Sequence, residues 1–296
     1  MDGVLNINKP SGMTSHDVVL AVRRIVKEKR IGHTGTLDPM ATGVLVLCLG
    51  KATRIARYLE AGEKEYQAVM RLGVTTDTLD AEGRVLETRP YEPPGRSQLL
   101  RALDGFIGTI MQQPPVYSAI KVRGVPSYKL ARQGKAEPLK PRTVTIRHIE
   151  LTAYEDPFIS LTICCSKGVY VRTLCADLGE SLHAGAHLTR LVRTRSGQFG
   201  IGHAVTIEQL ERLAASDSVE KSLLSLDEAL SEFPSVRVDD AEAIRISHGN
   251  RIHCLRDFVP LHPAMVRIHD QSGRLLALAT AQENDFKPEL VFSCDE

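Results

Sequence analysis

The stretch GHTGTLDPMATGVLVLCLG, residues 32–50, places one acidic residue, Asp38, in a loop rich in glycine and threonine, immediately before an apolar strand. Glycine in such a loop allows a bulky ligand to approach the backbone closely. The most frequent role of an Asp-Pro pair is to form a turn or to cap a helix. A lone carboxylate in a partly desolvated loop can instead act as a nucleophile or a base. Both interpretations of Asp38 are open, and the rest of the chain must decide between them.

The composition is that of an ordinary soluble globular protein. The 296 residues are 43% hydrophobic and 25% charged, and 37 Lys and Arg against 36 Asp and Glu give a net charge of +1. The N-terminal sequence MDGVLNINKP lacks the basic and apolar regions of a secretory signal. The longest apolar run, around Val44–Leu49, is too short to span a bilayer. We expect a soluble, cytoplasmic monomer that needs no membrane and no obligate protein partner.

The common metal and cofactor motifs are missing from the sequence. Gly50-Lys51 is not a phosphate-binding loop, because Leu45 and Ala52 occupy the positions that such a loop needs. SGQFGIG has the wrong glycine spacing for a dinucleotide site. The six cysteines form no C-x-x-C pair, the histidines show no H-E-x-x-H spacing, and no G-x-S-x-G segment indicates a serine hydrolase. We therefore expect neither a metal nor a cofactor.

Hydrophobic periodicity predicts strands and helices in irregular alternation. Expected strands are GVLNINK, VLVLCLG, FISLTICCS and KEYQAVMRL, the last with Tyr66 on its apolar face. Expected helices follow Thr14 or Ser15, occupy RSQLLRALDGFIG and LCADLGESL, and begin at a capping box at Thr206. This arrangement favours an α+β fold on an antiparallel or mixed sheet with flanking helices. EFPSV resembles a linker, so we expect a main domain over 1–232 and a small β-rich module over 233–296.

A basic, proline-interrupted arm is predicted over about 112–147. It carries eight cations and a single acid, Glu137, within a nearly neutral protein. The cations are Lys121, Arg123, Lys129, Arg132, Lys135, Lys140, Arg142 and Arg147. A charge run of this kind is most often a solvated surface loop, but it also suits the binding of a polyanion.

The segment around Asp38 resembles the signature of the bacterial-type tRNA pseudouridine-55 synthase family, whose members isomerise uridine 55 in the T loop. Other segments resemble the family's other blocks in the same order: KPSGMTSHDVV, KEYQAVMRLGVTTDTLDAEG, QQPPVYSAIKVRGVPSYKLARQG, CSKGVYVRTLCADLG and AHLTRLVRTRSGQF. Two departures are slight: VLVLCLG stands where a proline often follows the first Val-Leu, and Val169 replaces a common Thr. The resemblance implies a pseudouridine-synthase-like sheet core with an inserted arm, followed by a C-terminal module similar in position and size to a PUA-like RNA-binding domain.

The resemblance also implies a catalytic role for Asp38. The carboxylate would attack the ribose or the uracil ring, or would abstract a ribose proton, and the sequence does not choose between these routes. Arg172 would pair with Asp38, keeping it ionised and oriented in a buried pocket. Without the resemblance, Arg172 would be taken for a surface strand residue.

Further residues are implied to contact the nucleotide. Tyr66 would stack on the target base, and its hydroxyl could help remove the proton from carbon 5. Tyr170, expected on the same side of one strand as Arg172, would line the pocket together with Leu191. Each of these side chains would otherwise pass for ordinary core.

Two more residues are implied to contact the surrounding RNA. His33 would fill the gap left by the flipped nucleotide, which offsets part of the few kcal/mol that base flipping costs. Lys121 is assigned to a phosphate or pocket contact. The basic arm would clamp the phosphates of the tRNA T stem-loop and give a salt-dependent affinity. No cofactor is needed, because the isomerisation breaks one bond to the sugar and forms another, which carboxylates can catalyse as they do in glycosidases.

Two rival functions stay open at this point. A tRNA-binding folding chaperone would use the arm and the C-terminal module and would not need Asp38. A nucleoside glycosidase would need a second acidic residue close to Asp38, and the neighbouring sequence offers none.

Overall fold

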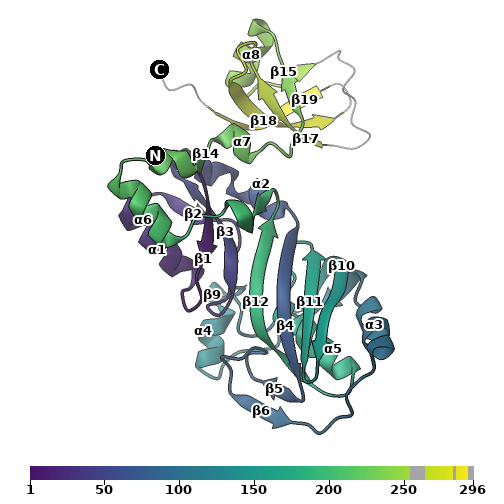
Figure 1. Ribbon diagram of the computed structural model, residues 1–296. Coiled ribbons are helices and arrows are strands. Elements are labelled where there is room, and N and C mark those ends of the chain that lie inside the picture. The colour runs from purple at the N-terminus through teal and green to yellow at the C-terminus, as the bar shows by residue number, and fades with distance from the viewer. Residues whose placement is uncertain (254–263, 283–284, 293–296) are drawn as a thin grey trace. The chain divides into compact units, whose positions relative to one another are not determined.

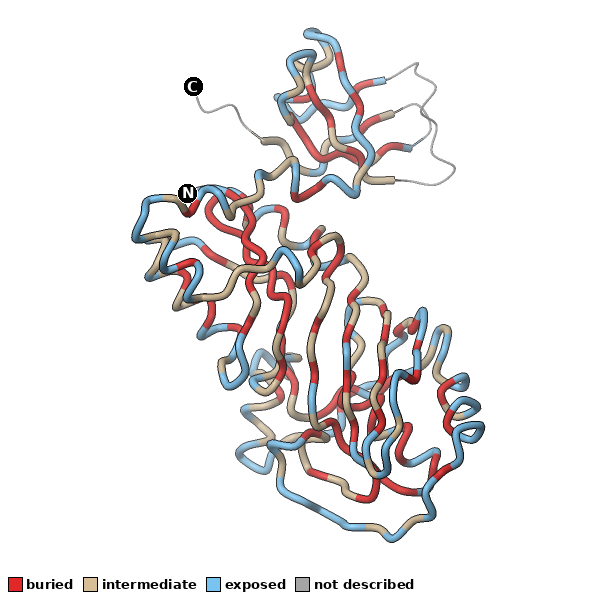
Figure 2. The backbone as a smooth tube through the Cα atoms, in the orientation of Figure 1, coloured by how far each residue is buried: buried red, intermediate tan, exposed pale blue. Residues whose placement is uncertain are grey.

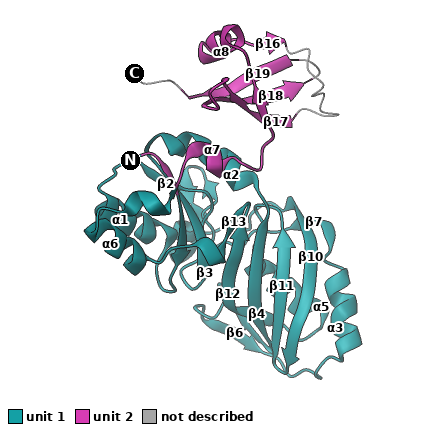
Figure 3. Cartoon of the chain, turned by 45° about the horizontal axis from the view of Figure 1, so that its top comes forward, with its two compact units in different colours: residues 1, 5–223 teal, residues 2–4, 224–296 magenta. Residues whose placement is uncertain are grey.

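A computed structural model describes residues 1–253, 264–282 and 285–292, which form two compact units (Figure 3). Unit 1 comprises Met1 and Leu5–Leu223, and unit 2 comprises Asp2–Val4 and Leu224–Glu296. The division therefore falls after Leu223, whereas the sequence predicts a boundary after residue 232. Cys254 and Cys294 lie outside the described residues, and the other four cysteines are free thiols.

Unit 1 is built on a ten-stranded sheet with the order β14-β1-β3-β12-β4-β11-β10-β7, in which β2 also pairs with β3 and β13 with β12 (Figure 1). β3 and β12 run parallel, and β12, β4, β11, β10 and β7 are antiparallel neighbours, so the predicted mixed sheet is confirmed. The strands of this sheet are β1 Gly3–Lys9, β2 Ile31–His33, β3 Thr42–Leu49, β4 Lys64–Leu72, β7 Gly108–Gln112, β10 Arg142–Glu155, β11 Phe158–Cys165, β12 Ala186–Ser196, β13 Phe199–Gly200 and β14 Leu223–Leu224. Two hairpins stand outside it, formed by β5 Val74–Thr76 with β6 Val85–Thr88 and by β8 Lys121–Val122 with β9 Val125–Pro126.

The strand sequences reflect how each strand is covered. In β4, Tyr66, Ala68, Met70 and Leu72 are buried while Gln67 is exposed, as the predicted alternation requires. In β3, every residue from Gly43 to Leu49 is buried (Figure 2), which explains why its sequence is a continuous apolar run rather than an alternating one.

Helices of unit 1 begin where the sequence supplies caps. Capping boxes open α1 at Thr14 and α6 at Thr206, so both predicted helix starts are confirmed. The α-helices are α1 Ser15–Val26, α2 Ala56–Ala61, α3 Arg96–Asp104, α4 Ser127–Arg132, α5 Val171–Ser181 and α6 Ile207–Ala215, with 3-10 turns η1 Gly50–Ile55, η2 Ile201–His203 and η3 Val219–Ser222.

Tyr170 and Arg172 do not share a strand, so that prediction is wrong. Tyr170 is extended and is the N-cap of α5, and Arg172 lies in the first turn of the helix. The helix starts three residues earlier than predicted because Val171, Leu174, Cys175 and Leu178 already form one buried helical stripe.

The irregular part of the basic arm is shorter than predicted. Gln112 ends β7 and pairs with Arg142, the first residue of β10, so the excursion from the sheet comprises residues 113–141. Arg142 and Arg147 belong to β10 because RTVTIRHIE alternates as a strand does. The arm itself contains the β8–β9 hairpin and α4.

Unit 2 is β-rich, as predicted, with a sheet of order β15-β17-β18-β19-β16 around its own apolar core. Its elements are α7 Leu226–Ala229, β15 Ser235–Arg237, α8 Asp240–Ser247, β16 Ile252–His253, β17 Ala264–His269, β18 Leu275–Gln282 and β19 Asp285–Val291. Asp227 of α7 is bound by Arg267 and His269 of β17, which explains why α7 belongs to unit 2. Across the described residues, none of the helices has both the length and the apolar character of a membrane span.

Candidate active site

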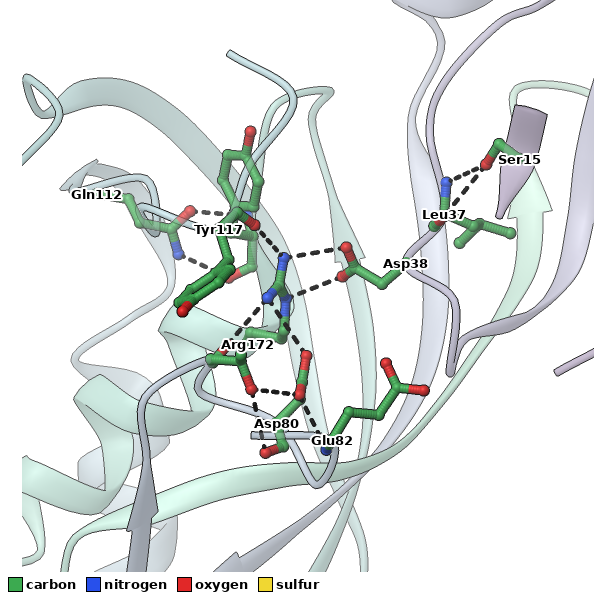
Figure 4. A network of polar contacts seen from close by, with 10 residues as sticks. Ser15, Leu37, Asp38, Asp80, Glu82, Gln112, Tyr117 and Arg172 are labelled. Carbon is green, nitrogen blue, oxygen red and sulfur yellow. Dashed lines mark hydrogen bonds and ion pairs between the residues drawn. The ribbon is translucent and has the colours of Figure 1, made fainter. Parts of the chain in front are cut away.

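Asp38 lies in the loop between β2 and β3, and the N-terminal segment holds both of its neighbours. Ser15 Oγ accepts a hydrogen bond from the backbone N–H of Leu37 (2.8 Å) and lies 3.1 Å from the carbonyl oxygen of Leu37 (Figure 4). Lys9 Nζ donates to the carbonyl of Pro39 at 3.1 Å. The residues before and after Asp38 are therefore fixed, which leaves its side chain little positional freedom.

Lys9 is a fully buried cation at this loop. Its ammonium also donates to the carbonyls of Pro10 (3.0 Å) and Met13 (2.6 Å), so all three donors are used. Burial lowers the pKa of Lys9 to about 8, against the opposing influence of the Asp38 charge. The sequence analysis did not single out Lys9. The only signal was its place at the end of the strand GVLNINK, where KPSGMTS begins.

Arg172 binds Asp38 from the first turn of α5. Its Nη2 donates to Asp38 Oδ1 at 3.0 Å, and its Nε lies 2.9 Å from Oδ2 as an ion pair rather than an aligned hydrogen bond. The guanidinium also donates to the carbonyls of Thr78 and Tyr117, both at 2.9 Å. The ion pair that the resemblance implies is thus present and is held from several sides.

A second carboxylate lies on the far side of Arg172. Asp80 Oδ2 is 3.3 Å from Arg172 Nη1, and its Oδ1 accepts from Thr78 Oγ1 and from the backbone N–H of Glu82 (Figure 4). Only 5% of the Asp80 side chain is exposed, against 31% of Asp38. Asp80 therefore supports the arginine, and Asp38 is the carboxylate that solvent or a substrate can reach.

Asp80 was not found from the sequence, where TTDTLDAEG predicts only a turn. Its side chain meets Arg172 across 92 residues of chain, so no local pattern distinguishes it from neighbouring turn residues such as Asp77. A glycosidase requires a second acid facing the same substrate. The fold supplies a second acid, but places it behind the arginine.

The electrostatics of the site raise the pKa of Asp38. Burial raises the pKa of Asp38 above its usual value, the Arg172 guanidinium opposes this, and the Asp80 charge adds to the rise. The net direction is upward because burial outweighs the attraction of Arg172, and the charge of Asp80 adds to burial.

Two of the predicted residues, Tyr66 and Leu191, lie on the neighbouring strands β4 and β12. β12 pairs with β4 so that Leu191 lies opposite Ala68 and Arg193 opposite Tyr66, which places these side chains on one face of the sheet. Both Tyr66 and Leu191 are buried. The Asp38 charge also influences the hydroxyl of Tyr66, which is consistent with their lying near one another.

Arg193 is a further buried cation that the sequence analysis missed. Its Nε donates to the carbonyl of Val44 (2.7 Å) and its Nη2 to the carbonyl of Gly35 (3.2 Å), which ties the Asp38 loop to β12. Gly43 permits this packing. A Cβ atom there would lie 2.3 Å from the carbonyl oxygen of Arg193, and the backbone φ is +99°.

His33 ends β2, five residues before Asp38. Its Nδ1 accepts a hydrogen bond from the backbone N–H of Gly35 at 3.3 Å. Burial and the nearby Arg193 charge lower the pKa of His33, so the ring is neutral near pH 7 and carries its proton on Nε2. His33 is therefore suited to stacking and to donating a hydrogen bond rather than to binding phosphate as a cation.

Tyr170 and Lys121 lie differently with respect to Asp38. Tyr170 is half-buried, burial raises the pKa of its hydroxyl, and the charges of Asp38 and Arg172 both influence it. Lys121 is exposed on β8, in the arm. Asp38 is thus paired with Arg172, and its charge acts on Tyr66 and Tyr170. Leu191 lies in the apolar core on β12, His33 lies at the end of β2, and Lys121 lies on a separate hairpin.

Comparisons with known proteins point to one family. The model of the TruB family pseudouridylate synthase N-terminal domain matches residues 23–171, and that of the tRNA pseudouridylate synthase B C-terminal domain matches residues 172–231. The chain is 44% identical to tRNA pseudouridine synthase B of Burkholderia mallei (strain NCTC 10247) over 98% of this chain and 96% of that one. It is 48% identical to tRNA pseudouridine synthase B of Syntrophotalea carbinolica over 84% and 81% of the two chains. It is also similar to a chain in the solved structure of an H/ACA RNP bound to a substrate RNA containing 2'-deoxyuridine, with a TM-score of 0.76 and 25% identity over 98% of this chain and 84% of that one.

Proposed function

The chain belongs to the TruB family of pseudouridylate synthases, and we propose that it isomerises uridine 55 to pseudouridine in the T loop of tRNA, with Asp38 as the catalytic carboxylate. The protein is an enzyme that forms pseudouridine in tRNA, as its family membership establishes. The position modified and the role of Asp38 are our proposal. The observation that carries it is a partly exposed carboxylate held by a buried arginine.

The arrangement suits a reaction that needs an ionised but reactive carboxylate. Arg172 fixes both oxygens of Asp38, and the elevated pKa of Asp38 makes its carboxylate more basic than a solvated aspartate. Asp38 acts on the nucleoside as a nucleophile at the ribose or the uracil ring, or as a base on a ribose proton. Both routes require the ionised form, and both are compatible with this geometry.

The atoms of the reaction balance without a co-reactant. The bond from ribose carbon 1' to uracil nitrogen 1 breaks, and the base turns while it is retained. A bond then forms between carbon 1' and carbon 5. The proton on carbon 5 is lost to solvent, and nitrogen 1 takes up a proton. Tyr66 is protonated at neutral pH because burial raises its pKa, so we assign it to stacking on the base and to hydrogen bonding.

Access to the nucleoside requires base flipping, since Asp38 cannot reach a base within a stack. We assign Tyr170 and Leu191 to the walls of the nucleotide pocket. We assign His33 to the space that the flipped uridine leaves, where a neutral ring stacks without an added charge. Lys121 and the other exposed cations of the arm are assigned to phosphates of the T stem-loop.

Tritium release from carbon 5 tests the proposal. A T-arm stem-loop tritiated at carbon 5 of its uridines should release tritium with the wild-type protein, and Asp38→Asn should slow release by about 10²–10⁴-fold or more. Asp104→Asn, which removes an exposed carboxylate at the end of α3, should behave as wild type. Equal release from Asp38→Asn and wild type would refute the assignment of Asp38.

Two further arms define the substrate and the product. A stem-loop with cytidine in place of uridine 55 should release no tritium, and continued release would place the reaction elsewhere. Nucleoside analysis should find pseudouridine in the RNA. Free uracil would instead indicate a glycosidase.

A further inference from the structure

The side chain of Gln112, the last residue of β7, forms two hydrogen bonds with the backbone of Tyr170. Its Nε2 donates to the carbonyl of Tyr170 at 3.1 Å, and its Oε1 accepts from the backbone N–H of Tyr170 at 2.8 Å (Figure 4). Gln112 is only 1% exposed. A single carboxamide thus satisfies both polar groups of one residue, as a neighbouring strand would. The opposite amide orientation would set donor against donor, so the contacts fix the orientation.

Tyr170, the residue that Gln112 binds, is the one from which α5 starts. Tyr170 is the N-cap of the helix and provides no side-chain cap, and its carbonyl also accepts the first helical hydrogen bond, from Leu174 N–H at 3.0 Å. Gln112 therefore anchors the first turn of α5 from outside. Arg172 lies in that turn, two residues after Tyr170.

The chain just after Gln112 contacts Arg172 directly. The carbonyl of Tyr117 accepts from Arg172 Nη2 at 2.9 Å, and the same Nη2 donates to Asp38 Oδ1 at 3.0 Å. The base of the arm thus holds the start of α5 at two places, one on the backbone of Tyr170 and one on the guanidinium of Arg172.

We propose that Gln112 is a positioning residue for pseudouridine formation, because its carboxamide fixes the start of α5 so that Arg172 meets both oxygens of Asp38. Gln112 acts through Tyr170 and Arg172 rather than on the nucleotide. The inference rests on the proposed function, since that reaction is the measure of its effect.

The test compares two exchanges of the same kind. Gln112→Met keeps the length of the side chain and removes both hydrogen bonds. Gln67→Met is the matched control, because Gln67 is exposed on β4. Single-turnover tritium release and stem-loop binding are measured for both variants. In Gln112→Met the rate constant should fall about 10–100-fold, the range expected from a misplaced catalytic group, while Kd changes by less than about threefold. Gln67→Met should match the wild type in both.

The pH profile separates positioning from a loss of stability. If Arg172 shifts, Asp38 is less well paired, and the acid limb of the rate profile should move to higher pH. A merely destabilised protein would lose amplitude in proportion to its folded fraction, with the limb unmoved. That result, or a rate within about twofold of wild type, would overturn the inference.

A second variant covers the case in which Gln112→Met does not fold. Gln112→Asn keeps a carboxamide but is one methylene too short to reach both groups of Tyr170. It should lose less of the rate than Gln112→Met does, and its acid limb should move in the same direction by a smaller amount. An unmoved limb in Gln112→Asn would also count against the inference. Wild-type protein that releases no tritium refutes the proposed function itself, whereas active wild type with normal Gln112 variants refutes only the inference about Gln112.

Discussion

A charge cluster in each of the two units shares one group between two partners, and in these two clusters the sharing runs in opposite directions. In unit 1, one guanidinium, Arg172, serves two carboxylates, Asp38 and Asp80. In unit 2, one carboxylate oxygen, Oδ1 of Asp227, accepts from two donors, Arg267 Nη1 at 2.7 Å and His269 Nε2 at 2.8 Å.

The pKa values follow the direction of sharing. Burial raises the pKa of both aspartates. In Asp38 burial prevails over the Arg172 guanidinium, and the charge of the second anion, Asp80, adds to the rise. In Asp227 the hydrogen bonds from Arg267 and His269 outweigh it, and the pKa falls below its usual value. The donor-poor cluster thus leaves a reactive carboxylate, whereas the donor-rich cluster makes a stable clasp between α7 and β17.

Removing the shared cation, Arg172, should change stability and activity more than any of the exchanges that follow. Arg172→Met leaves Asp80 buried without its ion-pair partner, so the free energy of unfolding should fall by about 3–5 kcal/mol and tritium release should be lost. Urea unfolding followed by circular dichroism measures the first effect. Arg147→Met is the control, because its ion pair with Glu63 is 64% exposed on the arginine side, and it should cost at most about 1 kcal/mol. Equal costs for the two variants would show that the Arg172 cluster contributes no more than a surface pair.

The partners of Arg172 also show how far the sequence leads. The strands were predictable because alternation marks one-sided burial in β4 and a continuous apolar run marks two-sided burial in β3. Asp38 and Arg172 were accessible through the resemblance of their motifs. Asp80 and Gln112 were not, because their contacts join segments 92 and 58 residues apart and depend on how the chain packs.

The sequence predicts the start of α5 three residues too late for a related reason. The run GVYVRTL is rich in residues that favour strands, and only its packing as a helical stripe decides otherwise. The position of Tyr170 at the helix start is therefore set by tertiary contacts that the local sequence does not encode, including the two hydrogen bonds from Gln112.

As the pH falls, protonation of Asp38 should stop catalysis before protonation of Asp227 weakens its bonds to Arg267 and His269. Asp38 acts in its ionised form and its pKa is raised, so the single-turnover rate should start to fall at a pH above the ordinary aspartate value of about 3.9. Well below the raised pKa, the fall should reach about tenfold per pH unit. Circular dichroism at the same pH values should show a folded protein. A rate that stays constant down to the pH of unfolding would contradict the elevated pKa.

Removing the charge of the clasp should weaken unit 2. Asp227→Asn loses charge-assisted hydrogen bonds worth about 1.5–3 kcal/mol when fully formed. Because the side chain is 38% exposed, solvent screening should reduce the cost to about 1 kcal/mol. A lowered pKa gives stability that is present above the unfolded pKa and is lost as pH falls through the folded pKa. The difference from wild type, measured by denaturation, should therefore disappear in strong acid. The control is Asp240→Asn, an exposed exchange in α8, which should cost about 0.5 kcal/mol or less. An equal loss of stability in both variants would show that the Asp227 cluster does not stabilise unit 2.

The smallest change in stability is expected for Asp38→Asn, and it should be opposite in sign to that of Asp227→Asn. A raised pKa means that the native state binds the proton more tightly than the unfolded state does, so the group stabilises the fold below its unfolded pKa and loses that contribution as pH rises through its folded pKa. At pH 7 the native protein therefore carries the cost of the ionised carboxylate. Asp38→Asn removes that cost while Asp80 continues to balance Arg172, so the variant should be as stable as wild type or up to about 1 kcal/mol more stable. Below pH 4 this advantage should shrink, because wild-type Asp38 is then protonated as well. If Asp38→Asn instead loses stability as Asp227→Asn does, then Asp38 is a clasp of the same kind, and its exposure to substrate must be explained in another way.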